Sequence, residues 1–153
     1  MLASRAFVGL TVRALAAVEA EVEAEVTLPQ FRALVVLAVR GTLRSADIAE
    51  ELQVNPSTGT RMTDRLAAKG LVRRVRSTDD RRVVRLRLTR AGHDIVESVM
   101  AHRRAELERI VAETAGVWQP AVTGALTAFA AAAGEMPEQE WWLGWQQHEN
   151  DAE

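Results

Sequence analysis

The sequence predicts a single, mainly helical domain that contains one small β-hairpin. The chain has 153 residues, of which 48% are hydrophobic and 26% charged, enough for one ordinary hydrophobic core. Along most of the chain the hydrophobic residues recur at three- and four-residue steps, the spacing of helices with one buried face. The exception is the stretch 71–88, which is rich in valine and alternates between apolar and charged residues as strands do.

Two helices are predicted before residue 41. The first runs to about Val26, and its apolar face consists of Phe7, Leu10, Ala14, Val18 and Val22. The second begins at Leu28-Pro29, because proline is tolerated in a first helical turn, and ends at Gly41. Its predicted buried face is Phe31, Leu34, Val35 and Ala38.

The next stretch predicts a helix-turn-helix. Ser45 is suited to cap a short helix over 46–52, whose apolar stripe is Ile48, Ala49 and Leu52. The turn 53–55 follows, and Asn55 then suits the N-cap of a helix from Pro56 to Lys69. Gly70 suits the left-handed position that ends this helix.

The stretches 71–76 and 83–88 predict two strands, with the polar segment 77–82 as the exposed tip of a hairpin. The whole is then a winged helix-turn-helix with helices before and after it. Val84, Leu86 and Leu88 share one strand face, and Arg85 and Arg87 share the other. These two arginines either form a solvated face or contact phosphates.

Two further helices complete the prediction. Thr89 is suited to cap a long helix that runs to about Thr114, with Ile95, Val99, Met100, Leu107, Ile110 and Val111 at helical spacing. Gly116 interrupts the pattern before a helix from about Val117 to Ala133, on which Trp118 falls on the apolar face. The expected divisions are therefore a first helix (1–27), a winged helix-turn-helix lobe (28–90), C-terminal helices (91–134) and a tail (135–153).

The tail is acidic and contains Trp141, Trp142 and Trp145. It could dock on the dimer, cover a ligand pocket or contact another protein.

Charge is distributed unevenly along the chain, although the net charge is only −2. Residues 40–90 hold twelve Arg and one Lys against six acidic residues, whereas residues 91–153 hold three Arg against eleven acidic residues. A basic middle between acidic flanks predicts one surface that faces a polyanion.

Several other functions find no support in the sequence. The chain has no cysteine, which excludes disulfides, thiolate chemistry and Cys-ligated zinc. His93, His102 and His148 lack the spacing of a metal-binding pair, and we expect them to face solvent. Since no nucleophile motif or phosphate-binding loop occurs either, we expect no enzyme activity and no cofactor. The apolar runs are shorter than the about 20 residues that span a bilayer, so we expect a cytoplasmic protein without membrane contact.

The helix 56–69 and the hairpin tip hold the residues expected to bind DNA. Hydroxyl and guanidinium groups donate to phosphates and base edges, and the helix offers them at Ser57, Thr58, Thr60, Arg61 and Arg65. At the tip, Arg81 and Arg82 are placed to reach a minor groove. Thr63 could equally face the core.

These segments resemble the MarR family of bacterial winged-helix transcriptional regulators. The resemblance is carried by 46–52, by 55–58 continuing to Asp64-Arg65-Leu66, by 69–72, and by Asp80-Arg81-Arg82 followed by Leu88-Thr89 and Gly92. It implies a homodimer that binds a palindromic operator in double-stranded DNA. The dimer would be built from the first and last helices, so 1–27 and 91–134 are the expected dimerisation helices, with Trp118 in the dimer core, and 28–90 is the expected DNA-binding lobe. The resemblance also implies that Arg81 is the wing arginine and that Asp80 steadies it. Gly59 departs from the family pattern, which has an apolar residue there, so either the two helices approach unusually closely or this helix is looser.

The expected function is a dimeric transcriptional regulator, more specifically a repressor that a small amphipathic aromatic effector releases from DNA. The effector would bind between the dimer helices and the DNA-binding lobe. The alternative is a winged-helix interaction module whose basic face binds an acidic protein rather than specific DNA.

Overall fold

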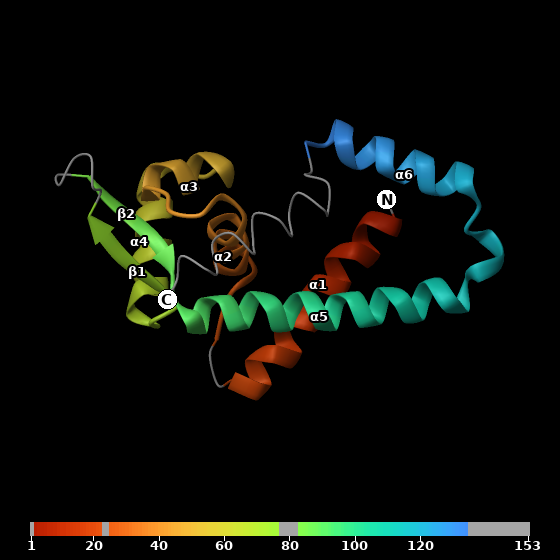
Figure 1. Ribbon diagram of the computed structural model, residues 1–153, viewed down its shortest axis with the longest axis horizontal. Coiled ribbons are helices and arrows are strands. Elements are labelled where there is room, and N and C mark those ends of the chain that lie inside the picture. Colours follow the sequence, from red (N-terminus) through yellow and green to blue (C-terminus); the bar gives the residue numbers. More distant parts are fainter. Residues whose placement is uncertain (1, 23–24, 77–82, 135–153) are drawn as a thin grey trace.

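The protein is described here by a computed structural model that covers residues 2–22, 25–76 and 83–134. The elements are α1 (Leu2–Val22), α2 (Leu28–Arg40), α3 (Ser45–Glu51), α4 (Pro56–Ala68), β1 (Val72–Arg76), β2 (Val84–Leu88), α5 (Arg90–Glu113), the 3-10 turn η1 (Ala115–Val117) and α6 (Pro120–Ala132). In Figure 1, α2, α3, α4 and the hairpin form a lobe at one end of the long helix α5, and α1 crosses α5 beside that lobe. The predicted fold class, mainly helical with one hairpin, is confirmed.

Local signals set the ends of α2 and α4 as predicted. Thr27 caps α2 through a capping box in which its backbone N–H donates to Gln30 Oε1 at 3.2 Å. Gly41 ends α2 with φ 73°, a value that favours glycine. Asn55 is the N-cap of α4, Pro56 is its first residue, and Gly70 follows its end with φ 70°.

The start of α3 differs from the prediction. The N-cap is Arg44 rather than Ser45, which is already helical. The Asp47 carboxylate accepts hydrogen bonds from the Arg44 backbone N–H at 3.0 Å and from its guanidinium at 2.8 Å. The Asp47 carboxylate, at the third helical position, therefore satisfies the backbone N–H of the N-cap residue, as the N3 side chain does in a capping box.

The hairpin pairs β1 with β2 in an antiparallel register that runs from Val72 opposite Leu88 to Arg76 opposite Val84. On its other edge, β2 exchanges two hydrogen bonds with Leu43: Leu43 N donates to Leu86 O at 3.1 Å, and Leu86 N donates to Leu43 O at 2.7 Å. The segment before α3 is thereby fastened to the wing.

One core joins α1, α2, α3, α4, the hairpin and the first half of α5. Leu34, Leu37, Ile48, Leu66, Val96 and Val99 are its largest fully buried side chains, together with Val18, Val26 and Thr63. On α1, Leu10, Ala14 and Val18 are buried as predicted, but Phe7 is 39% exposed. Val26 is buried too, yet it lies in the loop after α1, because α1 ends at Val22.

The first turn of α5 packs closely on the wing. The Thr89 hydroxyl accepts from Gly92 N at 3.2 Å and donates to Gly70 O at 2.6 Å. A side chain at Gly92 would collide with the carbonyl of Leu71. This close contact also buries His93, which is only 6% exposed, so the expectation that it faces solvent is wrong.

The second half of α5, η1 and α6 carry apolar side chains that are exposed to solvent. No residue in 101–134 is buried, and Val111, predicted to face inward, is 41% exposed. The apolar residues that stand open there are Val111, Val117, Trp118, Val122, Leu126 and Phe129. None of the described helices is both long and apolar enough to cross a membrane.

Candidate nucleic-acid interface

Helix α4 separates its packing residues from its polar ones. Gly59, Met62, Thr63 and Leu66 are buried, which places Thr63 in the core. The five residues that the sequence proposed for DNA contact are all exposed: Ser57, Thr58, Thr60, Arg61 and Arg65. The structure therefore brings these donors together on one outward-facing surface, which we call the α4 face.

Hydrogen bonds within α4 hold part of this face in place. The Thr60 hydroxyl donates to Pro56 O at 3.0 Å, and Arg61 Nε donates to Ser57 O at 3.4 Å. A guanidinium has five N–H donors, so the terminal nitrogens of Arg61 remain available to an outside acceptor. The first turn of α4 also adds backbone N–H groups that favour an anion.

Gly59 explains how α4 is seated on α3. A Cβ atom at Gly59 would lie 2.6 Å from the Cβ of Ala49 and 3.1 Å from the Ser45 carbonyl oxygen. Of the two explanations for glycine here, close approach of the helices is the one that the packing supports. The α4 face is consequently held by direct contact between helix backbones.

The hairpin adds further cations. Arg73, Arg74 and Arg76 of β1 are exposed, and Arg74 forms an ion pair with Asp64 of α4. Asp80, Arg81 and Arg82, the expected wing support and minor-groove residues, lie outside the described residues.

Arg85 and Arg87 are both half-buried and so do not form the fully solvated face considered from the sequence. The Nε of Arg85 is buried and has no hydrogen-bond acceptor among the described residues. Arg85 is also close enough to act on Asp47 electrostatically. The pKa of Asp47 is lowered first by its hydrogen bond from the Arg44 side chain and further by the charges of Arg44 and Arg85.

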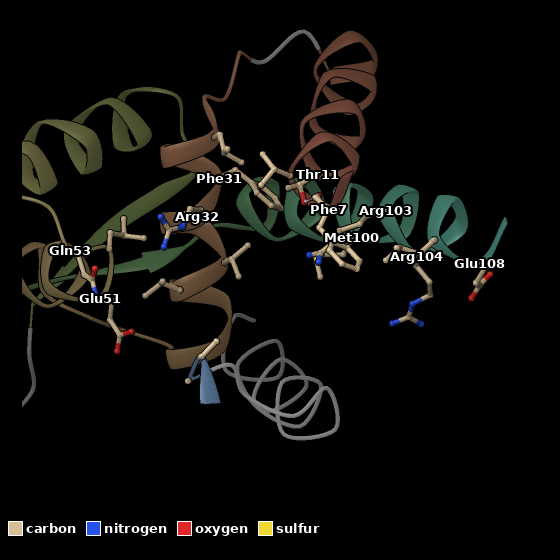
Figure 2. Close-up of a pocket in the computed structure, with 18 residues that line it drawn as sticks. Phe7, Thr11, Phe31, Arg32, Glu51, Gln53, Met100, Arg103, Arg104 and Glu108 are labelled. Atoms are coloured by element: carbon tan, nitrogen blue, oxygen red, sulfur yellow. Dashed lines mark hydrogen bonds between the residues drawn. The ribbon is translucent and has the colours of Figure 1, made fainter. Parts of the chain in front are cut away.

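The structure shows a second feature, an open groove of about 1310 Å³ between the lobe and the helices α1 and α5, where the family resemblance implied an effector site. We call it the interlobe groove. Figure 2 shows Phe7 of α1, Phe31 of α2 and Met100 of α5 gathered in it, with Arg103 beside them. Arg32 and Arg104 also line it, as do Glu51 and Glu108.

Sequence periodicity could not have found this groove, because its walls come from segments far apart in the chain. The one available signal was Arg103-Arg104, two cations within the apolar pattern of α5. Within the described parts of the chain, no group of three or more His, Asp or Glu side chains gathers as a metal site would.

Comparison with known proteins gives a consistent result. The model of the MarR family matches residues 26–84, the span that holds the core of the lobe. The HTH-type transcriptional repressor MdtR of Bacillus subtilis is 43% identical over 84 residues, which cover 55% of this chain and 54% of the repressor. This chain thus spans about half the length of the curated relatives it matches.

Solved structures extend the similarity over most of the fold. The crystal structure of RV1404 from Mycobacterium tuberculosis is 38% identical, has a TM-score of 0.78, and covers 89% of this chain and 90% of that one. A MarR family protein from Bacillus stearothermophilus is 26% identical, with a TM-score of 0.65 and coverage of 87% and 88%. The similarity includes the helices outside the lobe as well as the lobe itself.

Proposed function

Because this chain belongs to the MarR family, we propose that it is a transcriptional regulator that binds double-stranded DNA sequence-specifically as a homodimer. The observation that carries the proposal is the α4 face, with five exposed donors on a helix whose opposite side is locked to α3 at Gly59. A rigid helix with exposed hydroxyl and guanidinium groups suits the major groove.

In this proposal residues 28–90 are the DNA-binding lobe. Arg61 and Arg65 read base edges or hold phosphates, and Ser57, Thr58 and Thr60 donate from the same face. Arg81 and Arg82 enter the neighbouring minor groove, with Asp80 steadying Arg81. The exposed arginines of β1 lie on the same lobe and add to the attraction for phosphates.

The dimer is supported by the open apolar surface at the other end of the molecule. Trp118, Leu126 and Phe129 are 37%, 41% and 74% exposed, which is unusual for large apolar side chains on a lone domain. A second copy that covers this surface would place two α4 helices about one helical turn of DNA apart. The matching operator is a pseudo-palindrome.

Repression and response to a ligand are the finer parts of the proposal. MdtR, which is 43% identical to this chain over 84 residues, is a repressor. The interlobe groove has aromatic and cationic walls and lies between the lobe and the helices α1 and α5. A small amphipathic aromatic effector bound there would therefore change the position of the lobe relative to α1 and α5. Such a regulator works in the cytoplasm and needs neither enzyme activity nor a cofactor.

Selection from a random duplex library by the purified protein tests the central proposal, with light scattering on the same sample. We expect an enriched two-fold palindrome bound by a dimer. The proposal would be contradicted if the selected sequences were unrelated and if added salt weakened binding equally on all of them. That result would favour an interaction module that binds an acidic protein.

A further inference from the structure

The interlobe groove contains a charged donor without an acceptor. Arg103 Nε is buried, and it has no hydrogen-bond acceptor among the described residues. Leaving an N–H of a charged group buried and unsatisfied is costly, so a carboxylate or carbonyl oxygen is expected beside it. Arg32 lines the same groove and forms no hydrogen bond or ion pair with a described residue.

The groove also exposes apolar surface next to these arginines. Val8 is 55% exposed and Phe7 is 39% exposed, and both line the groove with Phe31, Met100 and Leu107. Arg32, Arg103 and Arg104 outnumber Glu51 and Glu108 in the lining, so an occupant that combines aromatic or aliphatic groups with negative charge fits the groove.

The described chain stops at this groove. After α6, Ala133 and Gly134 themselves belong to the groove lining, so the segment 135–153 starts at its edge. This segment contains six acidic residues, no Lys or Arg, and the three tryptophans Trp141, Trp142 and Trp145. Trp141 follows Gly134 by seven residues, which span at most about 25 Å when fully extended.

We propose that residues 135–153 dock in the interlobe groove, with their tryptophans against its apolar wall and a carboxylate on Arg103. Complementary charge, complementary apolar surface and the position of Gly134 each support this assignment. The inference goes beyond the proposed function, because it concerns contact within the chain and does not depend on DNA. A small effector that binds in the same groove would have to displace the docked tail.

Thiol reactivity tests the docking directly, since the natural chain has no cysteine. Val8→Cys places a thiol in the groove, and Val12→Cys places a control thiol one turn further along α1, exposed but outside the groove lining. Each is made in the full chain with the natural tail and with Trp141, Trp142 and Trp145 all changed to Ala.

With the natural tail we expect the thiol of Val8→Cys to react slowly, and about tenfold faster with the substituted tail, which corresponds to about 1.4 kcal/mol of docking. The Val12→Cys rate should be the same with both tails. An unchanged Val8→Cys rate would overturn the proposal, and so would equal acceleration at both positions.

Arg103→Ala provides an independent check. This substitution should increase the reaction rate of the Val8→Cys thiol in the chain with the natural tail. It should not change that rate in the chain whose three tail tryptophans are replaced by alanine. Arg109→Ala, which removes an arginine of α5 outside the groove lining, is its matched control. Protection that disappears on dilution would assign the groove to a second copy and also overturn the proposal.

Discussion

On the surface of the proposed DNA-binding lobe, some charged side chains already form ion pairs within the protein, and others can still bind a partner. Asp47 is occupied by Arg44, and Asp64 by Arg74, both within the protein. Arg61 uses one donor on the backbone of its own helix and keeps the others. None of the five residues proposed to contact DNA from the α4 face forms an ion pair with a described residue.

Arg61 and Arg81 should respond differently to removal. Arg61→Ala should cost about 1–3 kcal/mol on the preferred sequence and relax the choice of base, because a lost base contact matters only for the correct base. Arg81→Ala should weaken binding to all sequences and lower the salt slope by about 1, because it removes a cation from the DNA contact. Titrations of specific and scrambled duplexes at several salt concentrations measure both, and an equal loss for Arg61→Ala on every duplex would exclude base reading.

Because the pKa of Asp47 is lowered by folding, the free energy of unfolding should depend on pH in the acid range. The pKa of Asp47 in the folded protein lies below the ordinary value of 3.8. The ionised carboxylate therefore stabilises the folded protein fully when the pH is above 3.8, and this stabilisation is lost as the pH falls through the pKa of the folded state. We expect Asp47→Ala to be less stable than the natural chain at neutral pH, with the difference shrinking toward zero in strong acid. Urea unfolding from pH 7 downward measures this, and Glu50→Ala controls for removal of another carboxylate from α3. A difference that stays constant into strong acid would contradict the role of the ionised carboxylate.

At the scale of elements, the contact between α3 and α4 determines how the α4 face is presented. The predicted apolar stripe of α3 is confirmed, since Ile48, Ala49 and Leu52 are buried. Periodicity could place that stripe toward a partner. It could not give the distance between the helices, which depends on Gly59 meeting Ala49.

Gly59→Ala should therefore destabilise the lobe by about 1–3 kcal/mol, although alanine is the better helix former, because its Cβ would overlap that of Ala49. Gly124→Ala is the control, since a Cβ there meets nothing within 4 Å and should gain up to about 1 kcal/mol. Thermal or urea unfolding measures both. Adding Ala49→Gly to Gly59→Ala should recover part of the loss, and a neutral Gly59→Ala would show that the helices separate freely.

At the scale of the molecule, the two ends have opposite surface chemistry. The lobe, at one end of α5 (Figure 1), is cationic and well packed, whereas η1, α6 and the residues between them expose large apolar side chains to solvent. Two copies joined through the apolar end would leave both cationic lobes free.

Phe129→Glu tests that arrangement. Burying a phenylalanine contributes about 2 kcal/mol, so its loss to a charge should raise the dimer dissociation constant by at least about thirtyfold. Light scattering or sedimentation over a concentration series measures this. Val84→Glu, which charges an exposed valine of the wing, should leave the dimer intact. If Phe129→Glu remained as dimeric as the natural chain, the apolar end would not be the interface.

The order of the elements, most of their ends and the residues of the α4 face followed from the sequence alone. These features depend on neighbours along the chain: Pro56 and Gly70 act on their own backbone, and helical spacing separates Arg61 from Met62. Only tertiary structure decided that His93 and Arg85 are covered, that Phe7 is open to a groove, and that Arg44 rather than Ser45 caps α3. Burial depends on which distant segments meet, and the interlobe groove exists only because α1, α2 and α5 come together in space.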